Sequence, residues 1–162
     1  MASIVTHPGP RAATSSEVVA RLKVDPVLQS FWLLRIGFTV APIAFGLDKF
    51  FGLLVDWDKY LSPAFSDILP GTTHQSMYIV GIVEIAAGIF VALMPRLGAY
   101  VVVAWLAGII LNLLLLQDFY DVALRDFGLL LAALTLARLA SIPGIAEPVV
   151  RSDGPAPGNS NR

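Results

Sequence analysis

The chain has 162 residues, of which 56% are hydrophobic and 14% charged, whereas an ordinary soluble domain has about 45–50% and about 25%. Eleven Lys and Arg oppose twelve Asp and Glu, leaving a formal net charge of −1, so disorder and a basic nucleic-acid-binding surface are both excluded. The chain has no cysteine and only two histidines, which excludes thiol, iron–sulfur and Cys-ligated zinc chemistry and argues against a histidine-rich metal or haem site. We therefore expect a membrane protein with no metal site.

Residues 1–30 carry Pro, Ser, Thr and scattered charge, without the long apolar stretch of a secretory signal. We expect a cytoplasmic tail and then a short amphipathic surface helix beginning near Ser16. Its expected polar face holds Glu17, Arg21 and Lys23, and its apolar face Val18, Val19 and Leu22. Asp25 followed by Pro26 is typical of a cap that starts a new helix.

Four apolar segments follow, each near the about 20 residues that cross a hydrocarbon core of about 30 Å. They are Phe31–Val55, Met77–Met94, Leu97–Leu116 and Val122–Ala140. The pattern predicts an all-α, up-down-up-down four-helix membrane bundle over residues 31–140. Residues 141–162 are rich in Gly and Pro, and we expect a disordered cytoplasmic tail.

The distribution of charges predicts the orientation of this bundle. One end carries Arg11, Arg21, Lys23, Arg96, Arg138, Arg151 and Arg162. The other end is mainly acidic, with Asp56, Asp58, Asp67, Asp118 and Asp121. Both termini are therefore expected in the cytoplasm, and a bacterial plasma (inner) membrane is the preferred location. The segment Tyr60–Ile68 is expected to lie flat at the outer interface.

Ionisable residues inside a span are costly, so each is a candidate site residue. Arg35 and Lys49 lie on one stripe of the first span, whereas Asp48 lies about 220° from Arg35 at 100° per residue. A kink at Pro42 would loosen this geometry. Each of the two cations stands near an end of the span, so it either reaches the headgroups or pairs inside the bundle.

Glu84 lies about 10 Å from the outer end of the second span, too deep for a short carboxylate to reach water. Gly81 and Gly88 share its face, so we expect Glu84 to face a closely packed helix. In the third span we interpret a four-residue repeat as a small-residue packing seam that ends in an amide: Ala104, Gly108 and Asn112.

The fourth span opens with Asp121, Arg125 and Asp126. The first two have the spacing of a surface pair, and Asp126, one turn deeper, is the stronger candidate acid. The topology places in the outer half of the bundle Asp48, Lys49, Glu84, Asn112, Arg125 and Asp126. Such a cluster is either a salt-bridge lock that fixes packing or a polar pocket for a quinone head group, a small substrate or a proton.

The stretch LLRIGFTVAPIAFGLDKFFG resembles the opening of the DoxX-like family of membrane proteins, with Arg35 and the Gly46 to Lys49 spacing. The similarity continues with Glu84, Gly88 and Arg96 and with Asp126, and covers about residues 31–140. The first loop is longer and more acidic than the family's. The resemblance implies a four-helix membrane protein, and some members of the family are the small membrane subunit of thiosulfate:quinone oxidoreductase.

Three functions remain open from the sequence. The chain lacks a nucleotide-binding fingerprint and residues for a redox centre, so it is not expected to be catalytic alone. The first hypothesis is a cofactor-free accessory membrane subunit of a respiratory or sulfur-oxidising quinone-linked oxidoreductase, with a quinone at a site shared with other redox subunits. The alternatives are a proton-coupled small-solute carrier, which would need a homo-oligomer to enclose a path, and a purely structural or assembly factor.

Overall fold

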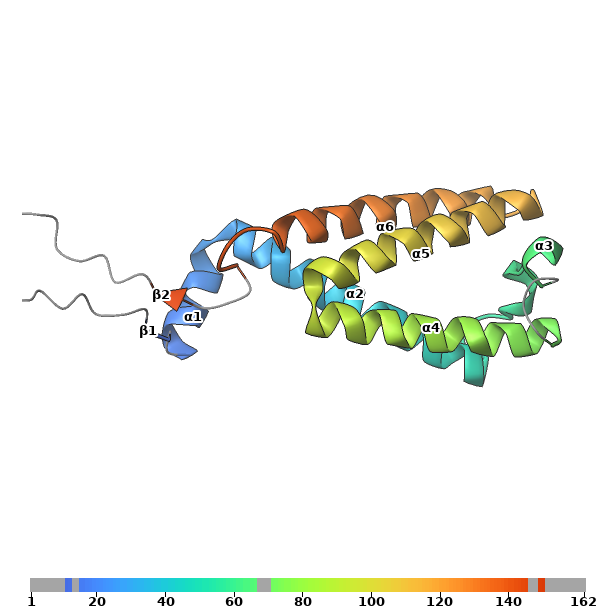
Figure 1. Cartoon of the computed structure of the whole chain (residues 1–162), viewed down its shortest axis with the longest axis horizontal. Coiled ribbons are helices and arrows are strands. Elements are labelled where there is room, and N and C mark those ends of the chain that lie inside the picture. The colour runs from blue at the N-terminus through green and yellow to red at the C-terminus, as the bar shows by residue number, and fades with distance from the viewer. Residues whose placement is uncertain (1–10, 13–14, 67–70, 146–148, 151–162) are drawn as a thin grey trace, which may run out of the picture.

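A computed structural model describes residues 11–12, 15–66, 71–145 and 149–150. Along the chain lie β1 (Arg11–Ala12), α1 (Ser15–Val24), α2 (Pro26–Phe51), the 3₁₀ helix η1 (Asp58–Tyr60), α3 (Pro63–Ser66), α4 (Thr73–Leu93), α5 (Pro95–Leu116), α6 (Tyr120–Leu139) and β2 (Val149–Val150). Four long helices run along the molecule's long axis (Figure 1). The predicted all-α class is confirmed, because the described elements are helices apart from β1 and β2. These two strands pair with each other in an antiparallel ladder of two residues.

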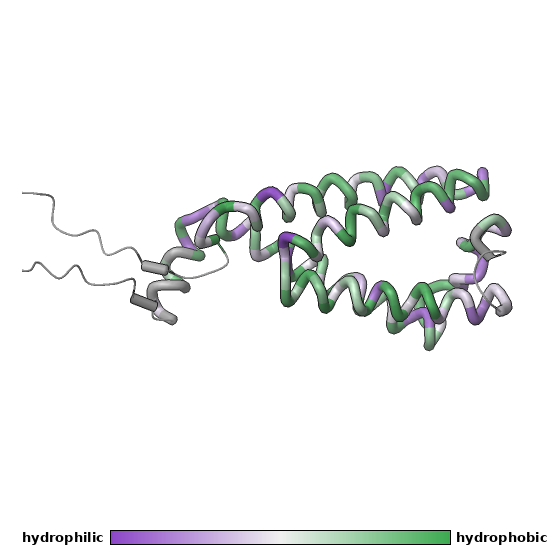
Figure 2. The backbone as a smooth tube through the Cα atoms, viewed as in Figure 1, coloured by the Kyte–Doolittle hydropathy of each residue, from purple (hydrophilic) through white to green (hydrophobic). Residues whose placement is uncertain are grey.

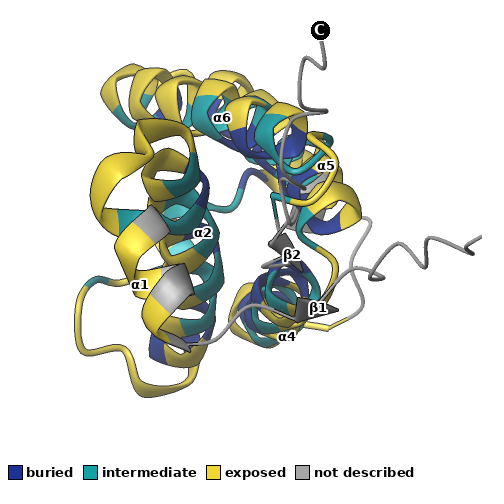
Figure 3. Cartoon of the chain, turned by 90° about the vertical axis from the view of Figure 1, so that its left-hand side faces the viewer, coloured by how far each residue is buried: buried dark blue, intermediate teal, exposed yellow. Residues whose placement is uncertain are grey.

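The long helices form two antiparallel pairs, in which α2 packs chiefly against α4 and α5 against α6. The two pairs converge at the end where α4 turns into α5 and separate toward the end that holds η1 and α3 (Figure 1). Seen along the bundle, the buried residues face the interior between the helices, and exposed residues cover the outside (Figure 3).

Local sequence signals set the ends of these helices. The Asp25 carboxylate accepts hydrogen bonds from the backbone N–H groups of Val27 and Leu28, at 2.9 and 3.2 Å, which confirms the predicted cap. The helix α2 continues through Pro42 and ends at Gly52, whose φ of 61° lies in the left-handed region. It therefore begins five residues earlier and ends four earlier than the predicted span Phe31–Val55.

Three helices, α2, α4 and α5, are long and apolar enough to cross a membrane. Apolar residues recur along all four long helices (Figure 2), and large apolar side chains such as Leu33 and Val40 are exposed on α2. An apolar exterior indicates a lipid environment. The fourth predicted span corresponds to α6, which is not among these three and carries four charged residues, Asp121, Arg125, Asp126 and Arg138.

The apolar core lies where the helix pairs converge. It is built around Phe31, Val91, Ala99, Leu136 and Ala137, each with no exposed surface. Small residues such as Ala99 and Ala137 allow the helix backbones to approach one another there, and large side chains such as Phe31 and Leu136 fill the space between them.

A tight glycine contact joins α2 to α4 nearer the other end. A Cβ atom added to Gly46 would lie 2.6 Å from the carbonyl oxygen of Gly81, and one added to Gly81 would lie 2.7 Å from that of Gly46. Only residues without a side chain allow two helix backbones to approach this closely.

The expected packing seam on α5 is wrong for two of its three residues. A Cβ atom added to Gly108 would meet nothing within 4 Å, and Ala104 is exposed. The helix instead packs with a neighbouring stripe, which includes Ala99, Val102 and Leu106. Periodicity alone did not distinguish these two faces, because both carry small or apolar residues.

Some predictions fall partly outside the described residues. The surface helix is present as α1, with Val19 and Lys23 exposed, but the side chains of Glu17, Val18 and Arg21 lie outside the description. The expected flat segment Tyr60–Ile68 begins at the last residue of η1 and includes α3, and residues 67–70 lie outside the description. The tail predicted over residues 141–162 also lies outside the description, apart from residues 141–145 and the strand β2.

Candidate functional site

A buried ion pair between Lys49 of α2 and Glu84 of α4 is the centre of the site. The Lys49 Nζ donates a hydrogen bond to Glu84 Oε2 at 2.7 Å, and the two side chains are 4% and 11% exposed. Each residue stands three positions after a glycine of the Gly46–Gly81 contact, so the close helix approach brings the side chains together. The predicted burial of Glu84 against a closely packed helix is confirmed.

Trp57, in the loop after α2, covers the lysine. The Lys49 Nζ lies 3.7 Å from the centre of the Trp57 ring, within the range of a cation–π interaction. The Trp57 indole N–H donates to Asp48 Oδ2 at 2.7 Å, while Asp48 Oδ1 accepts from the backbone N–H groups of Leu53 and Leu54. Asp48 is buried, but it forms no ion pair with Lys49. Its carboxylate instead holds the loop after α2 and orients the Trp57 ring.

A second acid and a second indole approach Glu84 from the other helix pair. Asp126 of α6 is half-buried and lies near enough for the charge of Glu84 to act on it. Trp105 of α5 also approaches the Glu84 carboxylate, but its buried indole N–H forms no hydrogen bond of acceptable geometry with the described residues. Among the described side chains, Lys49 therefore pairs with Glu84, and Asp126 is a second carboxyl group near that pair.

Asn112 lies in the same half of the bundle but bonds to the loop. Its Oδ1 accepts from the Ser62 backbone N–H at 2.8 Å, and its Nδ2 donates to the Tyr60 carbonyl at 2.6 Å. The ring of Tyr60 in turn packs against Phe119, with centroids 4.7 Å apart. Asn112 therefore anchors the segment that contains η1, beside the Lys49–Glu84 pair.

Two predicted cations lie away from this cluster. Arg35 is at the other end of α2, about 21 Å of helix rise from Lys49, where it donates to the Ala92 carbonyl at 2.7 Å and lies over the Trp32 ring. Arg125 pairs with Asp121 at 3.0 Å, and their side chains are 74% and 64% exposed. The prediction that Lys49 and Arg125 meet the acids together is therefore wrong for Arg125, and Lys49 is the cation that pairs with Glu84.

Sequence reasoning missed two aromatic parts of the site. Trp57 lies nine residues after Asp48, across a loop, and this spacing carries no periodic signal. Trp105 follows Ala104 on α5 without a polar neighbour to single it out. Its ring also lines an apolar groove of about 770 Å³ between α4 and α5.

No family model, curated protein or solved structure matches the chain. Within the described ranges, no group of three or more His, Asp or Glu side chains could hold a metal ion. The arrangement can do two things chemically. A lysine with three N–H donors can bind a carbonyl or carboxylate oxygen, and two neighbouring carboxyl groups beside one cation can exchange a proton.

Proposed function

We propose that the chain is a cofactor-free accessory subunit of a respiratory or sulfur-oxidising, quinone-linked oxidoreductase complex in a bacterial plasma membrane. In this proposal α6 is the fourth span, and both termini are cytoplasmic. The pairing of Arg11–Ala12 with Val149–Val150 supports this topology, because it holds both ends of the described chain at one end of the bundle. A chain that crosses the membrane an even number of times, as four spans would, has both ends on the same side. The DoxX-like order of Arg35, Lys49, Glu84 and Asp126 adds support.

The observation that carries the proposal is the buried Lys49–Glu84 pair, with the Trp57 ring over the lysine and with Trp105 and Asp126 near the Glu84 carboxylate. Ionisable groups at membrane depth are retained where they bind a ligand or move protons. A quinone has ring carbonyls that accept hydrogen bonds and takes up protons when it is reduced. Glu84 and Asp126 could exchange those protons, and the electrons would come from a cofactor of a partner subunit.

The test is purification of the tagged protein from its own membranes in a mild detergent. Mass spectrometry and a visible absorption spectrum are expected to reveal stoichiometric oxidoreductase subunits with haem or flavin bands. In that complex, Glu84→Gln is expected to alter the KM for a short-chain quinone, whereas Arg125→Gln, which removes an exposed cation, leaves it unchanged. A colourless preparation without redox subunits would contradict the proposal.

A proton-coupled small-solute carrier is the second candidate, favoured by the excess of acid over base in the cluster. Its assay is solute flux into reconstituted vesicles under a pH gradient. Flux that follows the gradient and is lost in Glu84→Gln would support a carrier. Flux that is insensitive to pH and to this substitution, or no flux at all, would count against it.

A further inference from the structure

The groove between α4 and α5 is an apolar surface feature that shares Trp105 with the surroundings of Glu84 but is lined by neither Lys49 nor Glu84. Its walls include Phe90 and Leu93 of α4 and Val101 and Trp105 of α5, and its lining is almost entirely apolar. From Val83 to Leu93 it follows about 15 Å of α4. The groove is open to the outside of the bundle, so lipid has direct access to it.

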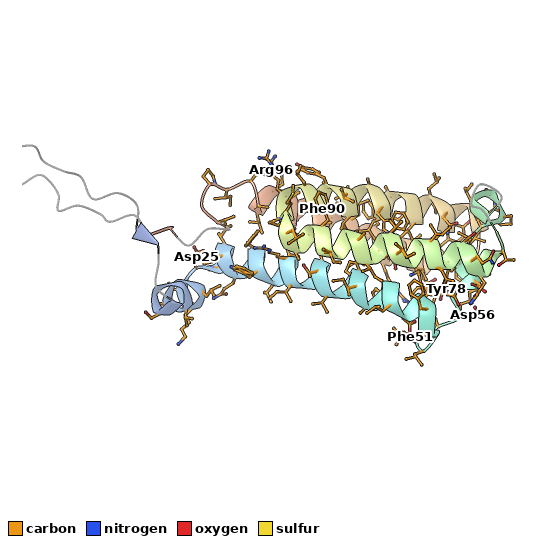
Figure 4. All side chains as sticks on the ribbon, turned by 60° about the horizontal axis from the view of Figure 1, so that its bottom comes forward. Asp25, Phe51, Asp56, Tyr78, Phe90 and Arg96 are labelled. Carbon is orange, nitrogen blue, oxygen red and sulfur yellow. The ribbon has the colours of Figure 1, made fainter. Side chains whose placement is uncertain are left out.

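An exposed arginine lies near one end of the groove, although it is not part of the groove's lining. Arg96 is the second residue of α5, three positions after Leu93, and Figure 4 shows Arg96 and Phe90 at the same end of the bundle. The Arg96 side chain is exposed and forms no ion pair or hydrogen bond with other described residues. Arg35, at the same end, differs because it already donates to the Ala92 carbonyl.

We propose that the groove and Arg96 form a binding site for an anionic phospholipid. The phosphate would bind the Arg96 guanidinium, and one acyl chain would lie along the groove as far as the Trp105 ring. Charge complementarity selects this occupant, because a cation near one end of a long apolar groove matches an anionic head group joined to an apolar chain. The proposal does not depend on the proposed quinone-linked function.

Trp105 supplies the reporter, because it is one of the residues that line the groove. Replacing Trp32 and Trp57 by Phe leaves Trp105 as the single tryptophan of the full chain. The protein is then titrated in neutral micelles with phosphatidylglycerol or phosphatidylcholine that carries bromine on the acyl chain, which quenches a tryptophan in contact. An arginine near a membrane surface contributes about 1 kcal/mol toward an anionic lipid, so phosphatidylglycerol is expected to bind about fivefold more tightly.

Arg96→Gln is expected to abolish that fivefold preference, and Arg96→Lys to keep most of it. Arg138→Gln is the matched control, because Arg138 is an exposed cation at the same end but on α6. Retained preference in that variant shows that the effect is local to the groove. Equal quenching by both lipids, or an equal loss in Arg138→Gln and Arg96→Gln, would overturn the proposal.

A further titration separates a lipid site from a simple phosphate site. Soluble glycerophosphate at the concentrations that bind the brominated lipid is expected to leave the quenching unchanged, because it lacks the chain that fills the groove. Displacement of the lipid by glycerophosphate at those concentrations would mean that the groove contributes nothing, and the assignment would fail.

Discussion

The Lys49–Glu84 pair gives a strong prediction about stability. At 2.7 Å, two unit charges attract by about 6 kcal/mol if the effective dielectric constant is about 20. Desolvation of several kcal/mol per ion offsets much of this attraction. Removing one partner leaves the other buried and unpaired, so Lys49→Met and Glu84→Met are each expected to lower the free energy of unfolding by about 3–5 kcal/mol.

The double variant Lys49→Met/Glu84→Met distinguishes pairing from separate local effects. Two apolar side chains of similar length remove both charges, so the double variant is expected to regain most of the loss, with a coupling energy of about 2 kcal/mol or more. The measurement is reversible unfolding in detergent micelles, followed by tryptophan fluorescence. Arg125→Gln breaks an exposed pair and is expected to cost less than about 1 kcal/mol. A double variant that loses the sum of the two single losses would refute this reasoning.

Four further predictions concern other parts of the bundle. Gly46→Ala is expected to lower stability by about 1–3 kcal/mol, because its Cβ would lie 2.6 Å from a backbone oxygen of α4. Gly108→Ala has open space and is expected to raise stability by up to about 1 kcal/mol in the same unfolding assay. Asn112→Leu removes two hydrogen bonds to the loop after α2, and hydrogen exchange there should quicken about tenfold or more. Asp48→Ala frees the Trp57 indole, so aqueous iodide should quench Trp57 emission more strongly than in the unsubstituted chain.

Helix existence and local helix chemistry could be predicted from the sequence. The Asp25–Pro26 pair specified a helix start, since a carboxylate cap and a proline in the first turn both act within a few residues. The helical angles calculated at 100° per residue, which place Asp48 and Lys49 on different faces of α2, also agree with the structure. Because α2 stays helical through Pro42, the two neighbouring side chains point to different partners, the loop and Glu84.

The partners across helices were harder to predict. Topology places Arg125 at the depth of Glu84, but depth does not specify the direction of a side chain around its helix. Arg125 faces outward, where Asp121 one turn earlier pairs with it at low cost. Asp126 is the next residue and is rotated by about 100°, so it faces the bundle instead.

The missing information lies in how closely the helices approach one another. The stripe on α2 places Arg35 and Lys49 on one face, yet Arg35 bonds to a carbonyl of α4 and Lys49 to a carboxylate of the same helix. Both contacts require α4 to lie against that face, and Gly46 and Gly81 permit this by removing the side chains between the backbones. If this is the cause, Gly46→Ala should weaken the coupling between Lys49 and Glu84 as well as overall stability. A double-mutant cycle repeated in that background measures the effect, and an unchanged coupling energy would separate the glycine contact from the ion pair.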